Sequence, residues 1–224
     1  MKTVLVSLSI LLCLSFANQK KTKIIFFGDS ITNAGGWPGG YILHIDTLCR
    51  KEGLSDKFEF IPAGQGGNKV YDLFLRLEED VLKKKPDVVV IFIGINDVWH
   101  KYLFGTGTDP DKFVKFYQAI IDRLRASKIN TVLCTPSAIG EKTDYTNPYD
   151  GTLDEFCERV RMLASANKLT LIDLRKSFRD YNLKHNTGNA EWGVLTFPGD
   201  GVHLSRTGNM FVAEEMWNTL KSIK

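Results

Sequence analysis

Three side chains in this sequence have the types and the spacing that nucleophilic catalysis requires. Ser30 lies in a Gly-Asp-Ser-Ile stretch directly after the apolar run 23–27. A serine just past the carboxyl end of a buried strand sits where open α/β sheets place their chemistry. Asp200 and His203 lie near the other end of the chain, where a turn can bring the carboxylate to Nδ1 of the imidazole. Nε2 is then free to take a proton from Ser30, which predicts a triad for acyl transfer.

Each of these residues also has a simpler explanation. A serine after a strand can cap the following turn, and Asp200 can form a turn with Gly201 and cap a helix. The other histidines offer no comparable partner. We expect His44 to be structural, within an apolar helical stripe, and His100 and His185 to lie in loops. The carboxylate beside His203 therefore favours the catalytic interpretation.

Two further segments have groups that can stabilise a developing oxyanion, a contribution of about 3–4 kcal/mol per donor. Asn96 follows the strongly apolar run 87–93, and its side-chain amide can point into the site. The segment 64–68 follows another strand candidate, and its glycines expose backbone N–H groups at little steric cost. Both segments can also be explained as tight turns.

Short apolar runs alternate with helical patterns along the chain. Strands are predicted at 23–27, 57–61, 87–93, 130–134 and 169–172, and helices at 40–53, 69–84, 111–127, 152–167 and 205–222. This alternation predicts a three-layer α/β/α, flavodoxin-like fold with a five-stranded parallel sheet. Three longer loops, 97–110, 135–151 and 182–200, are expected to wall one site.

The N-terminus has the features of a secretory signal peptide. Lys2 precedes an apolar run at 4–16, and small residues end at Ala17. We expect residues 1–17 to be removed, leaving 18–224 as a single domain that is exported to the periplasm or secreted. Because the apolar run is shorter than the ~20 residues of a spanning helix, no stable membrane insertion is expected after processing.

Composition narrows the range of partners. The net charge of +3 is too small to indicate a nucleic-acid or anionic-membrane partner. Cys49, Cys134 and Cys157 remain after the leader, so at most one disulfide can form among them, and their spacing does not resemble a zinc site. We expect buried thiols, no metal and no cofactor. The absence of H-E-x-x-H and G-x-S-x-G motifs disfavours a metal mechanism and the larger α/β-hydrolase fold.

Four blocks, in order along residues 23–222, resemble the SGNH (GDSL) hydrolase superfamily. The blocks are 28–31, 64–68, 94–97 and 200–203. The resemblance implies a role for five residues: Ser30 as nucleophile and first oxyanion donor, Gly67 and Asn96 as further donors, His203 as base, and Asp200 as its orienting carboxylate. Gly66 remains an alternative to Gly67. Two positions depart from the family pattern, because Asn68 stands where many relatives carry Asp and Pro62 where many carry Asn.

We therefore expect the protein to be an exported serine ester hydrolase that cleaves short acyl esters through an acyl-enzyme intermediate. The favoured substrates are O-acetyl groups of carbohydrates. The substrate is then a small-molecule or polysaccharide ester. Substrate contacts are predicted at Asp29, Trp37, Asp97, Trp99, Trp192 and Phe197. Aromatic side chains in the 97–110 and 182–200 loops would form a rim that suits sugar rings, acyl chains or aryl esters, or would pack these loops onto the body.

Three alternatives stay open. A lysophospholipase or thioesterase would use the same triad on longer acyl chains. A carbohydrate-binding or surface protein would keep the fold without turnover, although such a protein would be expected to lack one of the catalytic residues. Transfer of the acyl group to a sugar in place of water would also use the same triad.

Overall fold

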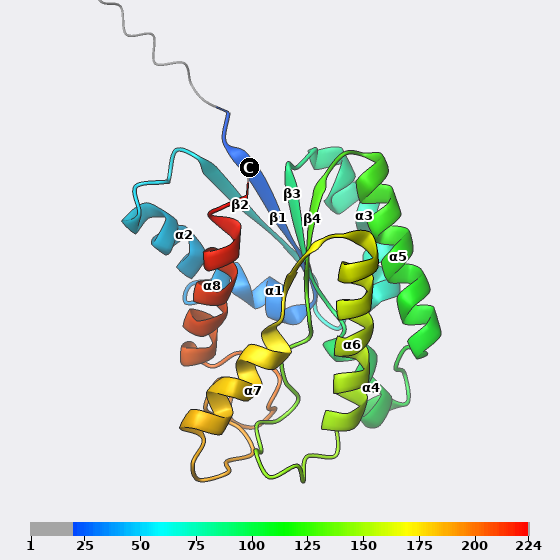
Figure 1. Cartoon of the computed structure of the whole chain (residues 1–224), viewed down its shortest axis with the longest axis vertical. Helices are drawn as coiled ribbons and strands as arrows, with labels where there is room; N and C mark the ends of the chain where they lie inside the picture. The colour runs from blue at the N-terminus through cyan, green and yellow to red at the C-terminus, as the bar shows by residue number, and fades with distance from the viewer. Residues whose placement is uncertain (1–19, 224) are drawn as a thin grey trace, which may run out of the picture.

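The computed structural model describes residues 20–223 and shows a parallel sheet between two layers of helices (Figure 1). The sheet has five strands in the order β2-β1-β3-β4-β5. The strands are β1 (Thr22–Gly28), β2 (Phe58–Gly64), β3 (Val88–Phe92), β4 (Asn130–Cys134) and β5 (Thr170–Ile172). The predicted α/β/α fold and its five-stranded parallel sheet are confirmed. The predicted signal peptide, residues 1–17, lies outside the described residues.

Helices cover both faces of the sheet. They are α1 (Ser30–Gly35), α2 (Tyr41–Lys51), α3 (Val70–Asp80), α4 (Ile95–Phe104), α5 (Pro110–Ala126), α6 (Asp150–Asn167), α7 (Leu174–His185) and α8 (Arg206–Leu220), with a 3₁₀ turn η1 (Leu82–Lys84) after α3. Helices α2 and α8 pack against each other on one face, while α3, α5 and α6 lie on the other (Figure 1). In the residues described, no helix is long and apolar enough to span a bilayer.

The central strands form because both of their faces are buried. Every residue of β3 is buried, and so are the five residues from Ile24 to Gly28 in β1, as expected for a parallel sheet covered on both sides. The register pairs Gly28 with Gly64 on one side and with Phe92 on the other. The carboxyl ends of β1, β2 and β3 therefore meet at one edge of the sheet. The candidate residues Ser30, Gly67 and Asn96 follow these three ends in the sequence.

Three helices were not predicted from the sequence: α1, α4 and α7. The expected loop 97–110 is largely occupied by α4, and the expected loop 182–200 begins inside α7. His100 and His185 consequently lie in helices, and the expectation of loop positions was wrong. The buried faces of α4 and α7 hold too few apolar residues to give a helical pattern in the sequence. The buried face of α4 includes the polar Asn96 and Asp97, and α7 buries only two apolar side chains.

Gly64 allows the end of β2 to approach helix α1 closely. A Cβ at this position would lie 2.1 Å from the backbone nitrogen of Asn33 and 2.6 Å from the backbone oxygen of Asp29. No flexible side chain can move aside to relieve these contacts. At Gly66, two residues further on, a Cβ would meet nothing within 4 Å.

We expect Gly64→Ala to lower the free energy of unfolding by about 1–3 kcal/mol, since overpacking forces the backbone to shift. Gly66→Ala should stay within roughly 0.5 kcal/mol of the wild type. Urea denaturation of the two variants measures the difference. Equal stabilities for the two variants would show that β2 and α1 are not in close contact in solution.

Candidate active site

Ser30 is the first residue of α1 and follows β1 after a single intervening residue, Asp29. The Asp29 side chain caps the helix, since its Oδ1 accepts a hydrogen bond of 2.9 Å from the backbone N–H of Ile31. Ser30 itself is half-buried, and its Oγ lies 2.9 Å from Nε2 of His203. Strand and cap together hold the hydroxyl at the carboxyl edge of the sheet, pointing at the imidazole.

Asp200 fixes the orientation of His203. Its Oδ2 lies 2.8 Å from Nδ1 of the imidazole, while Oδ1 accepts hydrogen bonds from the backbone N–H groups of Val202 at 2.8 Å and His203 at 3.0 Å. The carboxylate is therefore immobilised by its own turn before it contacts the ring. The structure thus brings Ser30, His203 and Asp200 into one hydrogen-bonded line, with the geometry that proton transfer from a serine requires.

The loop that carries His203 is anchored by the segment after β4. The backbone N–H of Gly140 donates to the carbonyl of Gly201 at 2.8 Å, and the N–H of Phe197 donates to that of His203 at 2.6 Å. Glu141 is 2% exposed, and its carboxylate accepts three hydrogen bonds of 2.7–2.9 Å from the stretch before Phe197. The donors are Val194 N, Leu195 N and Thr196 Oγ1.

The predicted oxyanion donors Gly67 and Asn96 lie in two segments that are bonded to each other. Asn96 is in the first turn of α4, is 1% exposed, and donates from Nδ2 to the carbonyl of Asn68 at 3.1 Å. Gly67 directly precedes Asn68 and has a φ of +74°, a left-handed conformation that favours glycine. The glycine-rich loop after β2 and the start of α4 are thereby joined at the carboxyl edge of the sheet.

Asp29 and Asp97 differ from the sequence-based expectation that they contact substrate. Asp29 is 2% exposed and Asp97 is 0% exposed, so both carboxyl groups lie beneath the surface. Asp97 accepts from the backbone N–H of Val70 at the start of α3, at 3.3 Å to each oxygen. Burial, with a smaller contribution from the nearby charge of Asp97, raises the pKa of Asp29 to about 7, and burial raises the pKa of Asp97 to about 6. Both residues support loops of the site from below.

A cavity of about 320 Å³ adjoins the triad on the Asp200 side. Its apolar lining comes mainly from Trp99, Leu103, Pro148, Tyr149 and Trp192. The Trp99 ring lies edge-on to the His203 imidazole, with 6.4 Å between the ring centroids. Two of the predicted aromatic residues, Trp99 and Trp192, therefore line one cavity, and Trp99 also lies beside His203.

The other two predicted aromatic residues do not line this cavity. Trp37 is 63% exposed in the connection between α1 and α2, and Phe197 is 56% exposed on the loop before Asp200. Contact of Trp37 and Phe197 with substrate stays a prediction from the sequence.

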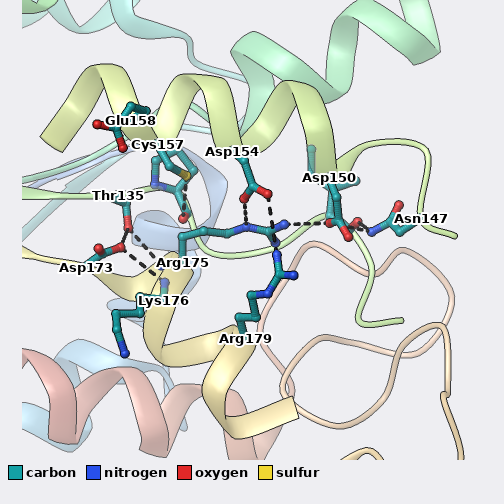
Figure 2. Close-up of polar contacts among 12 residues, drawn as sticks. Thr135, Asn147, Asp150, Asp154, Cys157, Glu158, Asp173, Arg175, Lys176 and Arg179 are labelled. Atoms are coloured by element: carbon teal, nitrogen blue, oxygen red, sulfur yellow. Dashed lines mark hydrogen bonds and ion pairs between the residues drawn. The ribbon is translucent and has the colours of Figure 1, made fainter. Parts of the chain in front are cut away.

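An ion-pair network around the buried guanidinium of Arg175 lies behind one wall of the cavity, and Figure 2 shows its contacts. Arg175 of α7 reaches across to α6, where Nη2 donates to Asp150 at 2.7 Å and Nε donates to Asp154 at 2.6 Å. Asp150 in turn accepts from Nδ2 of Asn147 at 3.1 Å. Because Asn147 precedes two cavity-lining residues, Pro148 and Tyr149, the network holds this wall in place. Such a pair is costly to break, since removing one partner leaves an uncompensated buried charge.

Three important charged residues escaped the sequence analysis: Arg76, Glu141 and Arg175. No motif marks them, because their partners are backbone groups and side chains that lie far away in the sequence. Over residues 20–223, no group of three or more His, Cys, Asp or Glu side chains is placed to hold a metal ion. Cys49, Cys134 and Cys157 are buried free thiols, as expected from the sequence.

With this geometry established, comparison with known sequences identifies the family. A sequence profile of the GDSL-like Lipase/Acylhydrolase family matches residues 26–210, which include all four sequence blocks. The chain belongs to this family. The resemblance to SGNH (GDSL) hydrolases inferred from the four blocks is confirmed.

Individual relatives of this GDSL-family protein are esterases. An acetylxylan esterase of Geobacillus stearothermophilus is 30% identical over 210 residues, which are 85% of this chain and 90% of that protein. The crystal structure of an acetyl xylan esterase, AlAXEase, has 54% sequence identity and a TM-score of 0.86, covering 88% of this chain and 99% of that one. A GDSL esterase/lipase of Arabidopsis thaliana is 26% identical over 90% of this chain and 86% of its own length. The protein is a carboxylic ester hydrolase.

The raised pKa of Asp29 predicts a pH dependence of stability. A carboxyl group whose pKa is higher in the folded state stabilises the fold below its unfolded pKa of about 4, and this contribution is lost as the pH rises through about 7. Asp29→Asn keeps the capping oxygen and removes the ionisation, although Asp97 and Arg76 still act on the site. Relative to wild type, the variant should gain about 1–4 kcal/mol in the free energy of unfolding between pH 4 and pH 8.

Urea denaturation at four or five pH values across this range measures the gain. Asp109→Asn, which changes the exposed capping carboxylate of α5, is the matched control for replacing a cap. A constant difference between Asp29→Asn and wild type at every pH would contradict the raised pKa.

Proposed function

We propose that this protein removes short acyl groups, chiefly O-acetyl groups, from carbohydrates by way of an acyl-enzyme on Ser30. The observation that carries the proposal is the continuous line of hydrogen bonds from Ser30 Oγ through His203 to Asp200, at 2.9 Å and 2.8 Å. A serine so placed has a base to take its proton and a carboxylate to stabilise the imidazolium that results.

Each half of the reaction uses the same groups. His203 Nε2 takes the proton of Ser30 Oγ as this oxygen attacks the ester carbonyl, and the tetrahedral intermediate then collapses. The alcohol leaves with the proton from His203, and the acyl group remains on Ser30. Water, deprotonated by His203, attacks the acyl-enzyme, and collapse of the second intermediate releases the acid and returns the proton to Ser30.

Three N–H donors surround the proposed oxyanion position: the backbone N–H groups of Ser30 and Gly67 and the side-chain amide of Asn96. The Asn96 amide carries two N–H groups, of which one is used by the carbonyl of Asn68. The other is available for the substrate oxygen. Gly67 is preferred to Gly66 as a donor because it immediately precedes Asn68, the residue to which Asn96 is bonded.

The position of the cavity supports a carbohydrate as the alcohol part of the ester. The leaving oxygen must lie next to His203 Nε2 to receive its proton, so the alcohol extends to the side of Ser30 opposite the oxyanion donors. Asp200, the partner of His203, lines the cavity of about 320 Å³ that has Trp99, Tyr149 and Trp192 in its walls, so we place the alcohol there. Aromatic faces with nearby polar groups suit sugar rings. The acetylxylan esterases among the relatives act on esters of this class by name.

We expect p-nitrophenyl acetate hydrolysis to fall by at least about 10³-fold in Ser30→Ala, because the nucleophile is lost. In the wild type, activity should decline steeply from acetate to palmitate. The measurement is kcat/KM across the ester series, followed by acetate release from acetylated xylooligosaccharides. A maximum at long chains would instead identify a lysophospholipase or thioesterase, and a wild type no more active than Ser30→Ala would refute the assigned nucleophile.

We also expect Trp192→Ala to raise KM for acetylated xylooligosaccharides by about 3- to 30-fold, the cost of losing one aromatic contact. Its kcat/KM for ethyl acetate, whose alcohol is too small to fill the cavity, should change by less than about twofold. Trp37→Ala is the matched control, since Trp37 is exposed and lies outside the cavity lining. Equal effects of Trp192→Ala on both substrates would argue against a sugar in this cavity.

A further inference from the structure

Arg76 of α3 is a charged, largely buried side chain whose hydrogen-bond acceptors lie in the segments that carry the proposed oxyanion donors. It is 12% exposed at the side chain, and every nitrogen of its guanidinium has an acceptor. Nη2 donates to the carbonyl of Gly28 at 2.6 Å, Nη1 to that of Ala63 at 3.0 Å, and Nε to Oδ1 of Asn68 at 2.7 Å. The guanidinium also stacks over the Phe27 ring, 4.5 Å from its centroid.

These acceptors belong to the two segments that carry the backbone donors. Gly28 is the last residue of β1, two positions before Ser30, and Ala63 lies at the end of β2. Asn68 directly follows Gly67. A rigid, planar fork that bonds all three fixes the distance between the two segments.

The same contacts extend to Asn96. The side chain of Asn68 accepts from Arg76, while its backbone carbonyl accepts from Nδ2 of Asn96 at 3.1 Å. One guanidinium is therefore linked, through at most one intervening residue, to the segments that carry all three proposed donors. No other side chain described above is linked to all three.

We propose that Arg76 is a positioning residue that sets the spacing of the oxyanion donors at Ser30, Gly67 and Asn96. The inference rests on the donor roles assigned under the proposed function. Its physical basis is that donors stabilise an oxyanion only when they are held in place before the charge develops, so that a displacement well below 1 Å already slows the reaction. Arg76 itself touches no reacting atom.

Asp80 provides a way to separate this role from the general stability of α3. It forms an ion pair with Arg76 one helical turn away, at 2.6 Å from Nη1. Asp80→Asn weakens that pair, yet it leaves in place the three bonds from Arg76 to the backbone and to Asn68. Arg76→Lys keeps the charge near Asp80, but a single ammonium cannot reproduce the three-way fork.

The test compares Arg76→Lys, Asn68→Ala, Asp80→Asn and Asn96→Ala in p-nitrophenyl acetate hydrolysis, with folding confirmed by thermal denaturation. We expect Arg76→Lys to lower kcat by about 10- to 100-fold while KM changes by less than about threefold. The inhibition constant of phenylboronic acid, whose tetrahedral serine adduct occupies the oxyanion position, should rise by a similar factor. Asp80→Asn should stay within about threefold of the wild-type kcat.

Asn68→Ala keeps the test decisive if Arg76→Lys does not fold, since it removes only the side-chain link and should lower kcat by about 3- to 10-fold. If the link acts through Asn96, the loss should largely disappear when it is made in the Asn96→Ala background. A wild-type kcat in Arg76→Lys would overturn the role of Arg76. If Arg76→Lys does not fold, a wild-type kcat in Asn68→Ala would overturn it. Wild-type kcat in Asn96→Ala would instead overturn the donor assignment on which the inference depends.

Discussion

The close approach of three backbone segments around Gly28 is the constraint on which the rest of the site depends. In the parallel register, Gly28 lies between Gly64 of β2 and Phe92 of β3. A Cβ at Gly28 would lie 2.3 Å from the backbone oxygen of Phe92, so only glycine fits without a shift. Ser30, the Gly67 loop and Asn96 all leave the sheet within a few residues of this point. Their proximity therefore follows from strand pairing before any side chain contributes.

Charged and titratable groups beneath the site then hold the emerging loops. Asp29 caps the helix that begins at the nucleophile, Asp97 holds the start of α3, and Arg76 bonds to both neighbouring segments. Burying these groups costs free energy, which is visible in the raised pKa values of the two carboxyl groups. Each group bonds to backbone N–H or carbonyl groups near the ends of strands and helices. The free energy of unfolding is lowered by this burial, while the proposed oxyanion donors are held in place before the reaction begins.

The base reaches the site by a different route. His203 lies on a loop far from the nucleophile in sequence, and the position of this loop is set by hydrogen bonds from Gly140 and Glu141, which follow β4. The same region of the chain forms the wall of the cavity next to Asp200, which the buried pairs of Arg175 support. Placement of His203 and the shape of the cavity are linked through the segment after β4, because Gly140 bonds to the loop of His203 and also lines the cavity.

The sequence by itself determined the fold class and the strands, and it predicted the three residues of the proposed triad. The apolar runs of the strands and the periodicity of the helices can be read from short stretches of sequence. Asp200 and His203 are three residues apart, so a single turn keeps the two side chains within reach of each other. The family resemblance added the donors at Gly67 and Asn96. Short helices such as α4 escaped prediction because polar residues of the site interrupt their apolar stripes.

Tertiary structure alone decided which aromatic residues share a cavity, that Asp29 and Asp97 are buried, and which charges support the site. Arg76, Glu141 and Arg175 bond to partners whose distance in space bears no relation to their separation in sequence. Such partners exist only once the sheet has assembled, since the packed chain is what brings their backbone acceptors and donors together. For this reason the chemistry could be predicted from residue types, whereas the framework that holds it could not.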